Sequence, residues 1–277
     1  MLVMPPISEK LLHKSRDRFG DILVTEQNLI RTLYFGNEKK QTSMFVPEPS
    51  VMVLRYAQAM VSALMFEAKP KKILIIGLGG GSLIHFLLKS YPDCEIDIVE
   101  LRRSVINIAK EYFFVPVNSP NITIAHGDAK PHVQQLAEHN AEIYDLILVD
   151  AFDEWGPAEI NNDAQFVLNC QQLLKKKGVL SFNLWNREMD KYPAVYRKFL
   201  SLFDGNLLEL SMGKRDSNVL LFGFNSDYHI KHIRAAEMRA IKLKMNCGID
   251  FPRYMTLIQH QNFTLVKKIK KHFSLSF

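Results

Sequence analysis

The chain has 277 residues, of which 47% are hydrophobic and 23% charged, with a formal net charge of +6 at pH 7. This composition is that of an ordinary globular protein and argues against a disordered or fibrous chain. No apolar run reaches the roughly 20 residues of a membrane helix and residues 1–10 lack a secretion signal, so we expect a cytoplasmic protein with no membrane partner.

Two short segments near the amino terminus have the character of strands. Residues 22–25 and 29–34 are rich in apolar and β-branched side chains and predict a hairpin or small sheet. An apolar run over residues 51–66 follows Ser50 and predicts a largely buried helix. Together these segments predict a small N-terminal β-hairpin domain over residues 1–66.

From residue 67 onward, strand and helix patterns alternate. Short apolar segments predict strands at 73–76, 96–99, 122–125, 146–149 and 179–182, with helices between them and a closing antiparallel pair at 207–210 and 219–224. The helix expected over 165–174 runs into three lysines and Gly178, which is typical of a helix C-terminus. Such alternation predicts an α/β fold, a Rossmann-like doubly wound sheet over 67–227 that binds ligands at its strand carboxyl ends.

Residues 228–277 predict a helical extension rich in lysine and arginine. A basic face can attract nucleic acid, but a solvated helix face explains it more simply, so nucleic acid is not an expected partner. The three cysteines, Cys94, Cys170 and Cys247, are far apart, which suits reduced thiols rather than disulfides. The histidines show no metal-ligand spacing, and we expect no metal.

A glycine-rich segment follows the first buried strand. Gly77, Gly79 and Gly81 allow a tight turn and a close approach of a ligand to N–H groups at a helix start. Dinucleotide enzymes, methyltransferases and aminopropyltransferases share this feature, and a tight turn without a ligand is the structural alternative. Ser82 stands where the dinucleotide pattern needs glycine or alanine, which disfavours a nicotinamide dehydrogenase.

Acidic residues follow the next two strands. Glu100 can accept hydrogen bonds from both ribose hydroxyls of an adenosine ligand, or alternatively pair with Arg102 or Arg103 at a helix start. Asp128 can accept a hydrogen bond from an adenine amino group, cap the following helix, or do both.

A cluster of acids follows the fourth strand. Asp150, Asp153 and Glu154 place like charges together at one end of the sheet. This arrangement favours a cationic substrate and a carboxylate that accepts a proton, with helix capping as the alternative. The ring of Trp155 can face a sulfonium cation or pack in the core.

These segments resemble the polyamine aminopropyltransferases, the family typified by spermidine synthase. Residues 73–83 are similar to its glycine loop, Val99-Glu100 to its ribose-binding turn and residues 127–129 to its adenine-contacting turn. Residues 150–158 are similar to its DSTDPxGPA segment and keep both aspartates and Gly156-Pro157-Ala158.

The resemblance implies a sheet of the adenosylmethionine-dependent methyltransferase type, a homodimer, and roles for particular residues. Asp150 would be the general base, and Asp153 would anchor the distal ammonium of the substrate. Gln41, Tyr56 and Trp155 would contribute to the substrate site. The glycine loop, Glu100 and Asp128 would hold the adenosyl group.

The implied reaction moves an aminopropyl group from decarboxylated S-adenosylmethionine to an amine acceptor such as putrescine, in polyamine biosynthesis. Gly80 departs from the family, which has an aspartate there that contacts the aminopropyl amine and disfavours the carboxylate of ordinary S-adenosylmethionine. A methyltransferase that uses ordinary S-adenosylmethionine is therefore one alternative, since N–H groups of a neutral loop can accept a carboxylate. A non-catalytic nucleotide-binding relative with a basic docking tail at residues 266–272 is another.

Overall fold

The computed structural model describes residues 9–36, 39–151, 163–185, 192–213, 218–225 and 230–263. The predictions for Asp153, Glu154, Trp155 and residues 266–272 lie outside these ranges.

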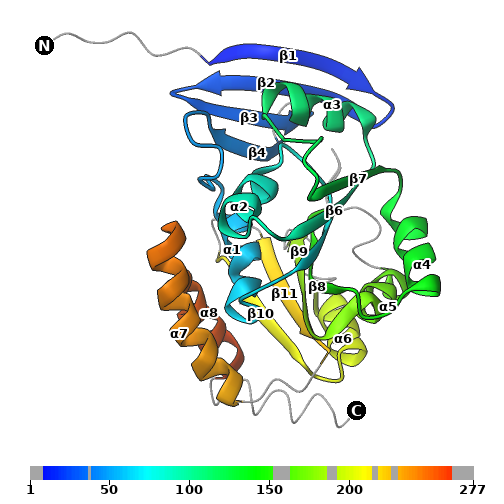
Figure 1. Cartoon of the computed structure of the whole chain (residues 1–277), viewed down its shortest axis with the longest axis vertical. Coiled ribbons are helices and arrows are strands. Elements are labelled where there is room, and N and C mark those ends of the chain that lie inside the picture. The colour runs from blue at the N-terminus through cyan, green and yellow to red at the C-terminus, as the bar shows by residue number, and fades with distance from the viewer. Residues whose placement is uncertain are drawn as a thin grey trace, which may run out of the picture.

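The amino-terminal part is an antiparallel sheet of four strands in the order β1-β2-β3-β4 (Figure 1). Its strands are β1 (Lys10–Asp17), β2 (Gly20–Gln27), β3 (Ile30–Phe35) and β4 (Lys39–Phe45). Ile22 and Val24 alternate along β2 and are fully buried, as is Leu33 on β3. The sequence predicted strands in the β2 and β3 regions, whereas β1 and β4 were missed because charged and polar residues dominate them.

The single helix predicted over residues 51–66 is wrong in its extent. The structure has a short α1 (Arg55–Met60) followed by a 3-10 turn, η1 (Val61–Met65). Met52 forms an antiparallel bridge with Met44, so the first residues of the apolar run extend the small sheet instead of the helix. The remaining residues from Ala59 to Met65 are buried, which explains the apolar run without a long helix.

The second sheet has seven strands in the order β10-β11-β9-β8-β5-β6-β7. The parallel strands are β5 (Lys72–Ile76), β6 (Glu95–Glu100), β7 (Ile122–His126), β8 (Tyr144–Val149) and β9 (Leu174–Trp185). β10 (Leu207–Ser211) and β11 (Asn218–Phe224) extend it in antiparallel fashion. The predicted α/β doubly wound fold is thus confirmed.

Helices alternate with these strands and cover the sheet. They are α2 (Ser82–Ser90), α3 (Arg103–Tyr112), α4 (Ala129–His139), α5 (Ala164–Leu173) and α6 (Tyr192–Leu202). Along β5, Ile73 and Ile75 belong to one hydrophobic core, while Leu74 and Ile76 belong to a second. Both faces of the strand are therefore buried, as its uninterrupted apolar sequence predicted.

The three lysines predicted to end a helix lie instead at the start of β9. Helix α5 stops at Leu173, and Leu174 is already extended, with φ −72° and ψ 133°. The Lys175 ammonium lies 2.8 Å from a carboxylate oxygen of Asp145 on β8. Pairing with β8 and burial of Leu174 outweigh the preference of lysine and glycine for a helix end.

The carboxyl-terminal part forms two helices, α7 (Ile230–Cys247) and α8 (Phe251–Phe263). They lie side by side next to α1 (Figure 1). The Arg239 guanidinium donates hydrogen bonds to the carbonyl oxygens of Met65 and Phe66, at 2.9 and 2.6 Å, which fixes α7 against η1. Within the described ranges, no helix combines the length and apolar character needed to cross a membrane.

Candidate active site

The strand order changes direction at β5. The chain proceeds from β5 to β6 and β7 on one side, and β8 and β9 lie on the other. The carboxyl ends of β5 and β8 meet there, because the Asp150 N–H donates to the Ile76 carbonyl at 2.8 Å. In sheets of this type, ligands bind in the crevice at such a switch point.

The glycine loop owes its composition to this crowded crossing. Gly77, Gly79 and Gly81 all have positive φ, at 95°, 51° and 75°. A Cβ on Gly77 would lie 2.2 Å from the carbonyl oxygen of Asp150, so any side chain there would displace the backbone of the neighbouring strand. The loop therefore brings the backbones of Gly77 and Asp150 into direct contact at the carboxyl ends of β5 and β8.

Glu100 is 7% exposed and binds two backbone N–H groups. One carboxylate oxygen accepts from Leu78 in the glycine loop at 2.8 Å, and the other accepts from Arg102 at 2.8 Å. Burial raises the pKa of Glu100 above its ordinary value, although both hydrogen bonds favour the ionised form. The Arg102 guanidinium makes its ion pair with Asp17 at 2.8 Å, while its charge also favours the ionised form of Glu100.

Asp128 is exposed after β7 and caps helix α4. Its carboxylate accepts from the Lys130 N–H at 2.9 Å, so the capping role predicted for this residue is confirmed. The adenine role stays a prediction.

Asp150 is half-buried at the end of β8 and has two side-chain partners. The Asn183 amide donates to its Oδ1 at 2.8 Å, and the Tyr56 hydroxyl hydrogen-bonds its carboxylate. Burial raises the pKa of Asp150 to about 6, and both hydrogen bonds act in the opposite direction. The pKa of Tyr56 is raised by burial and by the adjacent negative charge of Asp150.

The same tyrosine links Asp150 to the small sheet. Its hydroxyl lies 2.6 Å from the main-chain carbonyl oxygen of Gln41 on β4. A hydroxyl has one proton, so Tyr56 can donate it to Gln41 or to Asp150. The structure thus brings Asp150, Tyr56 and Gln41 together, although they are far apart in the sequence.

The neighbourhood includes three residues that sequence reasoning missed, Thr42, Asn183 and Asn218. Asn183 lies between Phe182 and Leu184 near the end of β9 and is 1% exposed. A single amide near the carboxyl end of an apolar strand was a signal that could have identified it. Thr42 and Asn218 carry no comparable signal in the sequence.

Thr42 explains why residue 80 is glycine. A Cβ there would lie 2.8 Å from the Phe113 ring and 2.9 Å from the methyl group of Thr42. The Thr42 hydroxyl also accepts from the Gly80 N–H at 2.8 Å. The space that a side chain at residue 80 would need is filled by a strand of the small sheet and by the residue that follows α3.

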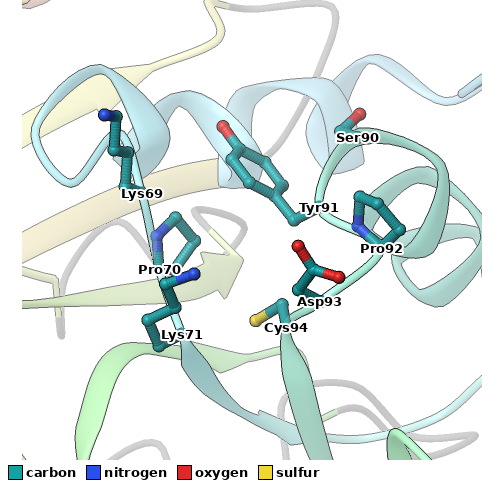
Figure 2. Close-up of a pocket in the computed structure, with 8 residues that line it drawn as sticks. All are labelled: Lys69, Pro70, Lys71, Ser90, Tyr91, Pro92, Asp93 and Cys94. Carbon is teal, nitrogen blue, oxygen red and sulfur yellow. The ribbon is translucent and has the colours of Figure 1, made fainter.

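A separate hollow lies at the amino ends of β5 and β6, away from the switch point, and Figure 2 shows the residues that line it. Residues 69–71 and 90–94, which precede β5 and β6, line its volume of about 210 Å³. Burial raises the pKa of the Cys94 thiol to about 11, so it is protonated and unreactive near neutral pH. In the described part of the chain, no three His, Cys, Asp or Glu side chains gather as metal ligands would.

The strand order and the switch point at the carboxyl ends of β5 and β8 define the class as Rossmann-like doubly wound α/β proteins. Human methyltransferase-like protein 13 in complex with SAH superposes with a TM-score of 0.60 at 21% identity, covering 73% of this chain and 93% of that one. Spermidine synthase in complex with the transition state analogue AdoDATO gives a TM-score of 0.70 at 17% identity, covering 97% and 89%.

Sequence comparison identifies the family. Residues 54–192 match the spermine/spermidine synthase domain. The chain is 31% identical over 252 residues to the polyamine aminopropyltransferase of Neisseria meningitidis serogroup A, covering 91% of this chain and 94% of the relative. The chain therefore belongs to the spermine/spermidine synthase family, and the resemblance read from its motifs is confirmed.

Proposed function

We propose that the protein is an aminopropyltransferase of polyamine biosynthesis, which uses decarboxylated S-adenosylmethionine as donor and an amine such as putrescine as acceptor. The observation that carries this proposal is the contact of Asp150 with Tyr56 at the switch point, beside the glycine loop. The aminopropyltransferase named among its relatives supports the reaction class.

In this reaction Asp150 is the base. An alkylammonium has a pKa near 10.4, so the acceptor arrives protonated and has to lose a proton before its nitrogen can attack. The carboxylate takes that proton, the nitrogen forms a bond to the propyl carbon beside the sulfonium, and the carbon–sulfur bond breaks. The electron pair of that bond stays on sulfur, which leaves as the neutral thioether methylthioadenosine. The raised pKa of Asp150 narrows the gap in basicity between the carboxylate and the amine.

The adenosyl group belongs at the carboxyl ends of β5, β6 and β7. Glu100 accepts from the N–H groups of Leu78, Arg102 and Leu101, and the remaining acceptor site of its carboxylate can take a ribose hydroxyl. Asp128 is exposed and can accept from the adenine amine while it caps α4. Gly77, Gly79 and Gly81 let the donor approach the backbone. Asp153 and Trp155 remain proposed contacts of the substrate.

The glycine loop favours the decarboxylated donor although it lacks an acid. The N–H groups of Leu78, Gly80 and Gly81 donate to Glu100, Thr42 and the Leu78 carbonyl, respectively. A methionine carboxylate would have to displace these bonds to use the same donors. A neutral loop whose N–H groups already have these acceptors is therefore a poor site for the carboxylate of ordinary S-adenosylmethionine.

The decisive experiment is a side-by-side calorimetric titration with decarboxylated and ordinary S-adenosylmethionine, followed by chromatography of products after putrescine is added. We expect preference for the decarboxylated donor and release of methylthioadenosine. Release of S-adenosylhomocysteine with a methylated acceptor would support the methyltransferase alternative. Methyltransferase-like protein 13 has a similar fold, so the fold is compatible with that alternative. Binding without turnover across a panel of amines would support the non-catalytic alternative.

We propose further that the enzyme acts in the cytoplasm as a homodimer, without a nucleic-acid or membrane partner. Light scattering across a range of protein concentrations tests the dimer, and a monomer at working concentration would contradict it.

A further inference from the structure

Behind Asp150 the structure places two amides in series, and the proposed reaction does not use either. The Asn183 Nδ2 donates to Asp150 Oδ1 at 2.8 Å. The Asn218 Nδ2 in turn donates to Asn183 Oδ1 at 3.0 Å. Asn183 is 1% exposed, and Asn218 is half-buried at the start of β11.

Strand register explains why these residues meet. β8 and β9 are parallel with Val149 opposite Phe182, so Asp150 and Asn183 follow as neighbours one residue further on. β9 and β11 are antiparallel with Asn183 opposite Leu220. Asn218 is therefore the diagonal neighbour of Asn183 on the same face of the sheet, within reach of a side-chain hydrogen bond.

The direction of the hydrogen bonds is fixed by the carboxylate. An ionised aspartate only accepts, so Asn183 has to present its NH₂ group to Asp150 and its oxygen to the other side. Asn218 supplies the donor that this oxygen needs. If the Asn183 amide turned over, its oxygen would face the carboxylate and its NH₂ group would face that of Asn218.

We propose that Asn183 and Asn218 are positioning residues for the transfer reaction, in which Asn218 keeps the Asn183 amide turned so that it donates to Asp150 and holds that carboxylate in one orientation. The inference rests on the proposed function, since it assigns the amides to the proton acceptor of that reaction. In such a series the orientation of every hydrogen bond depends on that of its neighbour. A substitution at one end therefore changes the hydrogen bonding at the other end.

Two described groups act on the charge of Asp150, and they come from different elements. Tyr56 from α1 is the titratable one, and Asn183 from β9 is neutral. Both favour the ionised carboxylate against the effect of burial. Loss of the amide series should therefore raise the pKa of Asp150 further, while the bond from Tyr56 remains.

The test measures the pKa of Asp150 by NMR of protein labelled with ¹³C-aspartate, assigned with D150N, and the acid limb of kcat/KM with putrescine. N183L removes a hydrogen bond to a charged group and is expected to raise both values by about one pH unit. N183Q keeps an amide donor and should restore most of the difference. N169L is the control, since Asn169 is also a buried amide but binds Gln165 on α5.

The sharper variant is N218D, which keeps the size of the side chain and removes its NH₂ donor. The new carboxylate attracts the Asn183 NH₂ group, which turns the amide oxygen toward Asp150. We expect the pKa of Asp150 to rise at least as much as in N183L, and less in N218L. In N183L/N218D the Asn183 amide is absent and cannot turn. N218D should then raise the pKa of Asp150 only through direct repulsion between the two carboxylates.

The inference is overturned if N218D and N218L leave the pKa of Asp150 at its wild-type value, or if N218D acts equally with and without Asn183. It is also overturned if N169L shifts the pKa as N183L does. The NMR titration needs no substrate, so it decides the role of the amides even for a protein that releases no methylthioadenosine. Failure to release methylthioadenosine would reject the proposed function, not the role of the two amides.

Discussion

Two opposing effects determine the pKa of Asp150. Burial at the end of β8 raises its pKa to about 6, while hydrogen bonds from Asn183 and Tyr56 limit the rise. A base has to be ionised to accept a proton, so kcat/KM is expected to fall as the pH decreases through about 6. A pH profile of kcat/KM under saturating donor measures this, and a rate independent of pH between 5 and 7 would contradict the assignment.

D150N should lower kcat by about 10²- to 10⁴-fold, because an amide cannot accept the proton. Donor binding measured by calorimetry should change little, since the adenosyl contacts lie on other strands. D145N is the matched control. Asp145 lies on the same strand and binds Lys175 and the N–H groups of Lys71 and Lys72, so its loss should lower stability and leave the acid limb in place.

Gly80 is expected to be intolerant of any side chain. G80A places a Cβ 2.8 Å from Phe113 and 2.9 Å from Thr42, and overpacking of this kind costs about 1–3 kcal/mol. G80D adds a carboxylate in the same space and should lower the free energy of unfolding at least as much. G127A is the control, because its Cβ would meet no atom within 4 Å. Urea denaturation measures all three, and equal effects of G80A and G127A would reject the packing argument.

At the scale of elements, the sequence predicts best where one physical signal dominates. The apolar residues 73–76 of β5 and the glycines that follow them identified the central strand and its turn, because burial on both faces leaves little ambiguity. β1 and β4 carry mostly polar residues and become strands only through pairing within the sheet. Thr42 and Asn218 act through contacts between segments that are distant in sequence, and no local pattern indicates such contacts.

Gly178 shows how a correct local rule failed. Lysines followed by glycine are typical of a helix end, where Asn is also accepted because it adopts positive φ. In the structure, Gly178 has no positive φ and lies in β9, where a Cβ would be 2.9 Å from the Lys175 carbonyl oxygen and 3.0 Å from that of Tyr144.

G178N is therefore expected to destabilise the fold by about 1–3 kcal/mol through steric conflict. Gly205 provides the contrast, because it follows α6 with φ 80° and has free space around its Cβ position. G205N should cost only a few tenths of a kcal/mol, as roughly expected where Asn replaces a left-handed glycine. Thermal unfolding of both variants checks this, and the reverse order would restore the helix-end interpretation.

At the scale of the whole molecule, the small sheet completes a site whose other parts lie on the large one. Thr42 and Gln41 reach the glycine loop and Tyr56 from β4. Arg102 joins the two sheets at a second point, since its guanidinium is 4% exposed and binds Asp17 and the carbonyl of Gly20. The relative position of the sheets should therefore depend on this ion pair between the buried Arg102 and the half-buried Asp17.

The pH dependence of that pair has a definite sign. Burial raises the pKa of Asp17, but hydrogen bonds from Arg102 and Ser104 outweigh it and hold the pKa below its ordinary value. A carboxyl group with a lowered pKa stabilises the fold above its unfolded pKa, which is about 3.9. That contribution is lost as the pH falls through the folded value. The ionised pair thus supports the fold at neutral pH and weakens in acid.

D17N should lower the free energy of unfolding at pH 7 by about 3 kcal/mol, because it leaves the Arg102 charge buried without its partner. The loss should shrink as the pH falls below about 3.9, because the Asp17 carboxyl is protonated first in the unfolded chain and then, at its lowered pKa, in the folded wild-type protein. D21N is the control, since Asp21 pairs at 3.6 Å with an Arg16 that is 76% exposed, and such pairs contribute little. Urea unfolding from pH 3 to 7 separates the two variants.

D17N should also weaken donor binding at neutral pH, because Arg102 donates its N–H to Glu100. Unchanged donor binding in calorimetry would show that the site does not depend on the ion pair between the two sheets.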